Sequence, residues 1–247
     1  MFCEHRADDW ASYKMDYHNP HRELEPPERE IAVVDAALAT LQRAGALPHT
    51  RYDHARMLAY REAVREHFEI PWTAITPRMQ RLMYAINAIA QPRVVIAAGV
   101  FCGNTFIANA GAAVGPGACY EAEDLVGVEI DAEKAAQAEA NVRRIDPTGV
   151  ARIVAADALE VLANYPGRIW LLYLDADGPP GVGKGIYLDM LKMAYDKLPP
   201  GALVLAHNSV NCAQRLQQYF AFVRDEANLR ASVNVAIDNQ GLEVSVR

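Results

Sequence analysis

The stretch RVVIAAGVFCGNT, residues 93–105, decides the fold of this chain. It opens with a short apolar run, passes Gly99 and Gly103, and continues after Asn104 into residues with a helical pattern. We expect a strand, a tight turn and a helix start in that order, because glycine permits the unusual backbone angles of such a turn and lets a ligand approach closely. The first turn of the helix also offers free N–H groups. The stretch therefore predicts the floor of a nucleotide-type site at the carboxyl edge of a parallel sheet.

Strands and helices alternate on the carboxyl side of this stretch, which is typical of a parallel sheet with helices on both faces. The further strands are expected over the apolar runs 124–130, 151–156, 168–177, 202–208, 231–237 and 242–246. The last two runs alternate and are joined by a short polar turn, so they predict an antiparallel hairpin. We expect an α/β fold with a doubly wound, seven-stranded, mostly parallel sheet, and helices over about 186–198 and 209–226.

Three amphipathic helices are expected before the first strand. Apolar residues recur at helical spacing from Pro27 to Gly45 and again over 57–68, and a third helix begins at Pro77 with Thr76 as its N-cap. These helices form a cap over the sheet or an oligomer surface, and a homodimer is expected in the second case.

Residues 1–26 are polar and are expected to form an irregular arm or a short helix. A lid over the site is the alternative, because tyrosines and histidines are unusual in a free tail. We assign residues 1–75 to an N-terminal arm and helical cap, and residues 76–247 to the ligand-binding domain.

Composition narrows the function. The chain has 247 residues, of which 51% are hydrophobic, with a formal net charge of −7 and no basic block. This charge disfavours nucleic acids and anionic membranes as partners. No apolar leader or membrane-spanning run is present, so we expect a cytoplasmic protein. The four cysteines are scattered, and neither a disulfide framework nor a zinc site is indicated.

Two other nucleotide sites are disfavoured. A dinucleotide fold requires G-x-G-x-x-G, and the turn after Gly99 lacks the middle glycine. Residues 178–184 match the phosphate-binding pattern G-x-x-x-x-G-K, but Gly185 stands where a hydroxyl should hold magnesium. We therefore expect a flexible loop there, with Lys184 in solvent; contact of Lys184 with the substrate is the alternative.

Five segments resemble, in order and spacing, the class I S-adenosylmethionine-dependent methyltransferases, especially small-molecule O-methyltransferases of the catechol and caffeoyl-CoA type. These segments are 94–105, 126–142, 155–162, 171–178 and 198–208. The resemblance covers roughly residues 76–247. It implies a Rossmann-like fold, S-adenosyl-L-methionine as co-substrate, and methyl transfer to a small hydroxylated or amine-bearing molecule.

The resemblance also implies which residues contact the cofactor. They are Gly99, Phe101, Gly103, Asn104, Thr105, Glu129, Ile130, Asp157, Ala158 and Asp175. In this assignment Glu129 accepts the ribose hydroxyls and Asp157 accepts the adenine amine, for which carboxylates are suitable acceptors. The alternative for both acids is helix capping or plain solvation.

The sequence departs from the family pattern at two places. Ala97 replaces the acid of the first motif, so the cofactor's ammonium must be held by other groups, such as the Gly99 carbonyl or Asp175. His207 and Asn208 replace the metal-binding Asp-Asn pair of the fifth strand. With Asp175 they could bind a divalent ion, preferably a transition metal. Alternatively His207 is the general base, or it simply forms a hydrogen bond at a strand end. The metal question stays open, and the catalytic candidates are His207, Asp175 and Asn208.

A rival chemistry keeps the cofactor. Intramolecular attack would cyclise S-adenosylmethionine to azetidine-2-carboxylate and methylthioadenosine, and the loss of the acid at Ala97 would suit a free amine nucleophile. Phe101, Tyr173 and Tyr17 could cradle the sulfonium by cation–π attraction in either reaction. A non-enzymatic nucleoside-binding protein is a third alternative.

Overall fold

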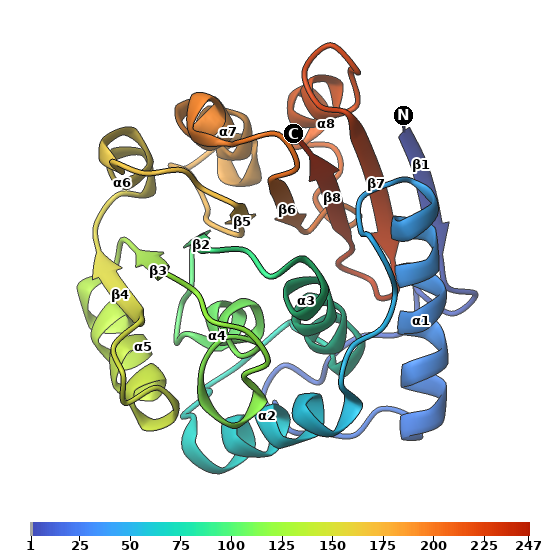
Figure 1. The fold of residues 1–247 in the computed structure, drawn as a ribbon, viewed down its shortest axis with the longest axis vertical. Helices are drawn as coiled ribbons and strands as arrows, with labels where there is room; N and C mark the ends of the chain where they lie inside the picture. Colours follow the sequence, from blue (N-terminus) through green and yellow to red (C-terminus); the bar gives the residue numbers. More distant parts are fainter. Residues whose placement is uncertain (1) are drawn as a thin grey trace.

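One mixed sheet organises the protein (Figure 1). The computed structural model describes residues 2–247, and in that range the sheet has eight strands in the order β1-β7-β8-β6-β5-β2-β3-β4. Only β8 among these runs antiparallel to its neighbours. The strands are β1 Phe2–Arg6, β2 Val94–Ala98, β3 Asp124–Glu129, β4 Ala151–Ala155, β5 Leu171–Leu174, β6 Leu203–His207, β7 Ala231–Ala236 and β8 Leu242–Val246.

Helices cover both faces of the sheet (Figure 1), as the alternating pattern predicted. One layer is formed by α1 Pro27–Arg43, α2 His54–His67, α3 Pro77–Ala90, α4 Asn104–Ala110 and α5 Ala132–Ile145. The opposite layer is formed by α6 Ala158–Asn164, α7 Tyr187–Ala194 and α8 Gln217–Val223. Short 3-10 turns occupy Gly115–Gly117, Gly183–Ile186 and Tyr195–Lys197.

The central strand β2 shows why the sequence folds this way. All five of its residues are buried. Val95 and Ala97 belong to the apolar cluster under α1 to α5, whereas Val94 and Ile96 belong to the cluster under α6 to α8. Successive side chains of a strand point to opposite faces, so a strand that is apolar throughout is stable only between two helical layers.

The three N-terminal helices lie where the sequence predicted them. Thr76 accepts a hydrogen bond from the Met79 N–H and caps α3, as expected. The helices share one apolar cluster with the sheet, including residues of β7 and β8. A domain boundary at residue 75 stays a prediction.

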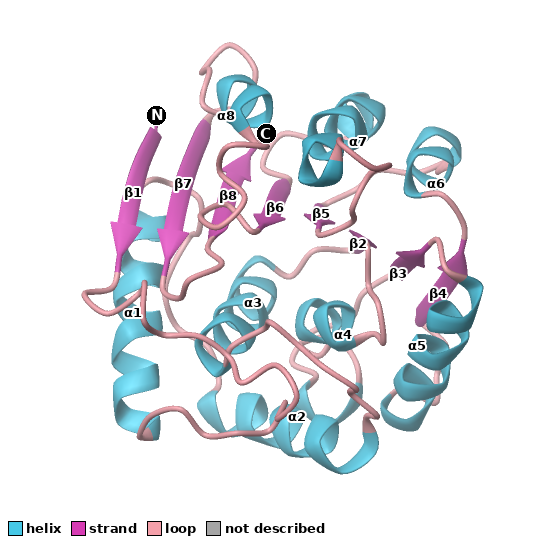
Figure 2. Ribbon diagram, turned by 180° about the vertical axis from the view of Figure 1, so that it is seen from behind, coloured by secondary structure: helices cyan, strands magenta, loops and turns pink. Residues whose placement is uncertain are grey.

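The first strand is a correction to the expected irregular arm, and it raises the strand number from seven to eight. Residues 2–6 form β1, which pairs in parallel with β7 at the edge of the sheet (Figure 2). The short segment FCEHR has no strong apolar alternation, so its pairing is decided by the free backbone groups of the β7 edge. The Arg224 guanidinium also lies 4.1 Å from the Phe2 ring centroid.

The prediction of a long helix over 209–226 is also wrong in its bounds. Only Gln217–Val223 form α8, and residues 209–216 are a series of turns. Asn208 has a left-handed backbone with φ of 64°, and its side chain bonds to Gln240. A helix cannot continue from such a residue.

Within residues 2–247, no helix has the length and apolar character needed to cross a bilayer. The four cysteines are free thiols, as the sequence predicted.

Candidate functional site

A cavity of about 790 Å³ lies at the carboxyl ends of β2, β3, β5 and β6. Its position follows from strand register. Leu174 of β5 pairs with both Ala98 of β2 and Ala206 of β6, so the next residues, Asp175 and His207, meet at one edge of the sheet. This volume is in the range of small-molecule and cofactor pockets.

Most residues predicted for the site line this one cavity. They are Gly99, Phe101, Asn104, Thr105, Glu129, Ile130, Asp175, His207 and Asn208. Gly103, Asp157 and Ala158 are not part of the lining. Asp157 caps α6 by accepting from the Leu159 N–H at 2.7 Å, and a Cβ on Gly103 would lie 3.3 Å from Ala138 Cβ. The predicted cofactor roles of these three residues stay predictions.

The turn after β2 requires its first glycine. Gly99 has φ of 81°, and a Cβ there would lie 2.4 Å from the backbone of Ala176, which follows β5. Phe101 also has a left-handed backbone, with φ of 50°. Its N–H donates to Glu129 Oε2 at 2.8 Å, while Glu129 Oε1 accepts from the Asp131 N–H at 3.2 Å. Glu129 therefore connects the glycine turn to the start of α5.

Three buried polar atoms along the cavity wall have no hydrogen-bond partner in the described part of the chain. They are Asn104 Oδ1, Thr105 Oγ1 and His207 Nε2. An unsatisfied buried polar group is costly, typically by about 1–3 kcal/mol. The residues that carry these three atoms line one cavity, so we take this cavity as the candidate site for a polar ligand.

The Asp175 carboxylate is held from three sides. Oδ1 lies 3.3 Å from His207 Nδ1 and accepts from Lys184 Nζ at 3.1 Å, and Oδ2 accepts from the Tyr173 hydroxyl at 3.2 Å. Burial alone would raise the pKa of Asp175, but the charges and hydrogen bonds of Lys184 and His207 lower it to about 2. Asp175 is therefore an ionised carboxylate inside the protein.

Lys184 is a correction to the solvated lysine that the sequence predicted. It is buried, and its Nζ donates to the Asp175 carbonyl oxygen at 2.6 Å as well as to the carboxylate. Burial would lower the pKa of Lys184, but Asp175 and Asp177 raise it above its ordinary value. The loop is also folded on itself through Gly178 N–H and the Gly183 carbonyl. The lysine thus points at a carboxylate and not toward a phosphate site.

An amide cluster forms the wall beside His207. Asn208 Nδ2 and Asn211 Nδ2 both donate to Gln240 Oε1 at 2.8 Å. Sequence reasoning missed Asn211 and Gln240, because the first lies in a segment expected to be helical and the second in the hairpin turn. Only the left-handed Asn208 brings these amides together at the cavity.

Aromatic side chains surround the mouth of the cavity. The Trp72 ring centroid lies 5.2 Å from that of Phe101 and 6.3 Å from that of Tyr17. Tyr17 and Trp72 both line the cavity, and each is 45% exposed. Tyr173, which the sequence suggested for the same purpose, is fully buried and does not line the cavity.

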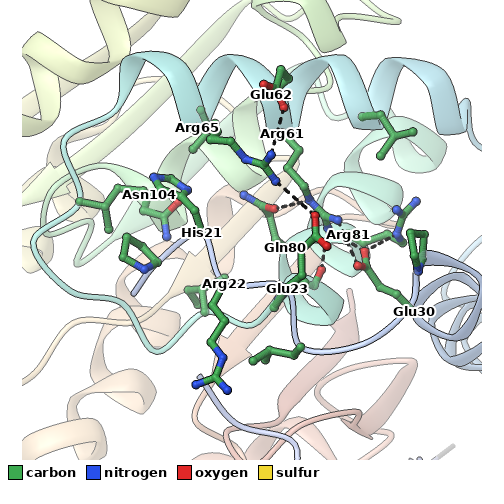
Figure 3. Close-up of a pocket in the computed structure, with 18 of the residues that line it drawn as sticks. His21, Arg22, Glu23, Glu30, Arg61, Glu62, Arg65, Gln80, Arg81 and Asn104 are labelled. Carbon is green, nitrogen blue, oxygen red and sulfur yellow. Dashed lines mark hydrogen bonds and ion pairs between the residues drawn. The ribbon is translucent and has the colours of Figure 1, made fainter. Parts of the chain in front are cut away.

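A second cavity of about 400 Å³ lies between α2, the start of α3 and residues 20–30 (Figure 3). Glu30 lies there between two arginines, at 2.7 Å from Arg61 Nη2 and 2.5 Å from Arg81 Nε. Asn104 and Ile75 line both cavities. Since Glu30, Arg61 and Arg81 satisfy one another, we interpret this cavity as a structural junction behind the main site.

We compared the chain with protein-family models, curated proteins and solved structures. Residues 96–209 match the family model of a methyltransferase domain. No curated protein matches the chain. Among solved structures, cofactor-bound Rv0187 from MTB is 18% identical, with 91% of this chain and 98% of that chain covered and a TM-score of 0.61. The O-methyltransferase TomG from Streptomyces achromogenes, involved in tomaymycin synthesis and solved with S-adenosylmethionine, is 17% identical, with coverages of 90% and 99% and a TM-score of 0.60. An O-methyltransferase from Bacillus cereus, in complex with S-adenosylhomocysteine, is 13% identical, with coverages of 88% and 100% and a TM-score of 0.58.

At these identities the structural similarity establishes the fold. The match to the methyltransferase domain covers the segment that carries most of the candidate site residues, because residues 96–209 run from the glycine turn through Glu129 and Asp175 to His207. Both agree with the resemblance inferred from the sequence. The chain therefore contains a methyltransferase domain and has the fold of S-adenosylmethionine-dependent methyltransferases.

Proposed function

We propose that this methyltransferase transfers a methyl group to a hydroxyl or amine of a small molecule, with His207 as general base. The observation that carries the proposal is that His207 lines the cavity at the ends of β5 and β6, while its buried Nε2 has no hydrogen-bond partner in residues 2–247. S-adenosylmethionine supplies the electrophilic methyl group. The residues of this chain bind the two reactants, align them and remove one proton.

The cofactor's nucleoside is assigned to the ends of β2, β3 and β4. Glu129 is the proposed acceptor for the ribose hydroxyls, since its carboxylate lines the cavity beside the glycine turn. Asp157, followed by Ala158 at the start of α6, is proposed for the adenine amine. The rings of Trp72 and Phe101, which both line the cavity, suit contact with the base or the sulfonium.

The amino-acid end of the cofactor is assigned to α4. Ala97 is buried within β2 and cannot supply the carboxylate usual in the first motif. Asn104 Oδ1 is a buried acceptor without a protein partner in residues 2–247, and Thr105 Oγ1 can donate. Asn104 is therefore our candidate for the cofactor's ammonium and Thr105 for its carboxylate.

The protonation state of Asp175 indicates which nitrogen of His207 can act as the base. Asp175 is ionised and can only accept, so His207 Nδ1 carries the hydrogen that lies between them. In the neutral ring Nε2 then keeps a lone pair, and no group in residues 2–247 donates to it. As the acceptor's oxygen or nitrogen forms its bond to the methyl carbon and the carbon–sulfur bond breaks, the displaced proton passes to Nε2. The products are the methylated acceptor and S-adenosylhomocysteine.

The acceptor is assigned to the space between His207, the amide cluster and the aromatic mouth. Asn211 and Gln240 offer both donors and acceptors there, which suits a polar small molecule. A cytoplasmic location, the lack of nucleic-acid and membrane partners, and a homodimer remain predictions from the sequence.

The test is incubation with S-adenosylmethionine and a panel of phenols and primary amines, followed by mass spectrometry of the nucleoside product. Adenosylhomocysteine together with a methylated acceptor is expected. Methylthioadenosine formed together with azetidine-2-carboxylate, without an acceptor and only in the presence of the protein, would instead establish the intramolecular cyclisation. Calorimetry with adenosylhomocysteine that shows no binding would contradict the proposal altogether.

A further inference from the structure

Lys184 lies where a cation would bind between the acids at the end of β5. Its Nζ is 3.1 Å from Asp175 Oδ1, 3.3 Å from Asp177 Oδ2 and 2.6 Å from the Asp175 carbonyl oxygen. An ammonium has three hydrogens, and these three oxygens can accept all of them. The side chain of Lys184 is only 11% exposed, so its charge is held inside the site and not in solvent.

The residues present do not fit the divalent metal that the catechol-type resemblance implies. Asp175 already accepts from Lys184, His207 Nδ1 faces the same carboxylate, and Asn208 Nδ2 donates to Gln240. The described residues contain no group of three or more His, Cys, Asp and Glu side chains arranged to hold a metal ion. A second cation would also meet the positive charge of Lys184 at a distance where repulsion is strong.

We propose that the Lys184 ammonium permanently replaces the divalent cation, so that this methyltransferase works without a metal. Lys184 acts here as a positioning residue: it neutralises Asp175 and fixes the carboxylate that orients His207. The acceptor then needs no pair of neighbouring hydroxyls to chelate a metal. It is selected by hydrogen bonds to the amide cluster of Asn208, Asn211 and Gln240 and requires a single nucleophilic group.

This inference rests on the proposed methyl transfer, but its test needs only the protein and Mn²⁺. Electron paramagnetic resonance measures free Mn²⁺ in the presence of wild type, Lys184→Met, Lys184→Arg and Lys192→Met. Lys192 lies exposed on α7 and provides the matched loss of a surface charge. Circular dichroism and thermal melting check that each variant folds.

Wild type, Lys184→Arg and Lys192→Met are expected to leave Mn²⁺ free. Lys184→Met exposes Asp175 and Asp177 to solvent cations, so it is expected to bind Mn²⁺ with a Kd of about 10⁻³ M or tighter. If Lys184 served stability alone, Lys184→Met would gain no Mn²⁺ binding. The absence of Mn²⁺ binding in Lys184→Arg would show that a positive charge at this position is what excludes the metal.

Binding of Mn²⁺ by the wild type would overturn the inference, and so would a folded Lys184→Met variant that binds none. Should Lys184→Met fail to fold, Lys184→Gln takes its place, and the wild-type measurement stands by itself. Because no cofactor or acceptor is present, these outcomes are separate from any failure of the proposed methyl transfer.

Discussion

His207 Nδ1 lies 3.3 Å from Asp175 Oδ1, although 32 positions separate the two residues in the chain. The pairing arises because β5 and β6 are neighbouring parallel strands whose registered ends bring the next residues together. His207 lines the cavity, and its Nε2, the ring nitrogen not engaged by Asp175, is buried and has no partner within residues 2–247. Chemistry at the site is expected to depend on this one contact.

Replacement of His207 by glutamine is expected to lower kcat by about 10²- to 10⁴-fold, the usual contribution of a general base. Glutamine keeps a polar side chain of similar reach but cannot take up the proton. Calorimetry with adenosylhomocysteine should show nearly unchanged binding. A variant that retains kcat within a few-fold of wild type would remove His207 from the role of base.

Replacement of Glu129 by alanine is expected to weaken adenosylhomocysteine binding by about 1.5–3 kcal/mol, as for hydrogen bonds to a charged group. Calorimetry measures the effect, and Glu133→Ala, an exposed acid in the first turn of α5, is the control. Glu129 also accepts from the Phe101 N–H, so thermal melting must accompany the measurement. Equal affinities for the two variants would place the ribose elsewhere.

Asn104→Ala is expected to weaken adenosylhomocysteine binding while leaving methylthioadenosine binding unchanged. Adenosylhomocysteine has an ammonium that can donate a hydrogen bond to Asn104 Oδ1, whereas methylthioadenosine lacks the amino-acid end. Asn104→Asp should strengthen the first interaction, since a charge-assisted hydrogen bond is stronger than a neutral one. A parallel loss for both ligands would show that Asn104 supports the turn and does not contact the ammonium.

Arg78→Met is expected to destabilise the fold by about 3–5 kcal/mol, because removal of one partner leaves buried charges uncompensated. The fully buried Arg78 guanidinium bonds to both oxygens of Asp9 and of Glu25 and so attaches the N-terminal segment to α3. Arg22→Met, which removes an exposed pair with Asp16, is the control and should cost at most about 1 kcal/mol. Urea unfolding measures both, and similar values would contradict the assignment.

Acid is expected to destabilise the protein through carboxylates with depressed pKa values. Hydrogen bonds from Arg78 lower the pKa of Asp9 below its ordinary 3.8, and Lys184 and His207 overcome burial to lower that of Asp175 to about 2. A depressed folded-state pKa contributes stability above the unfolded value, and this contribution is lost as pH falls through the folded value. The free energy of unfolding should therefore fall as pH drops from 3.8 toward 2. Asp9→Asn, less stable at neutral pH, should lose less over that range, and an identical slope would exclude Asp9.

Local patterns in the sequence were sufficient for the parts of the fold that local physics controls. The fully apolar β2, the glycine turn and the capped start of α3 were all predicted, because periodicity, φ requirements and N-caps act over a few residues. Strand β1 was missed, since its pairing depends on the exposed edge of β7, more than two hundred positions away in the chain.

The sequence by itself determined that Glu129 and Asp175 end parallel strands and that His207 stands where the family has an acid. Tertiary structure decided what these residues face. Lys184 turns inward to Asp175 because the loop 178–185 folds back, and Gln240 reaches Asn208 because β8 pairs with β6. Contacts of this kind depend on strand register and loop conformation across long separations in the chain, which no local pattern encodes. The pairing of His207 with an ionised Asp175 was therefore visible only in the folded chain.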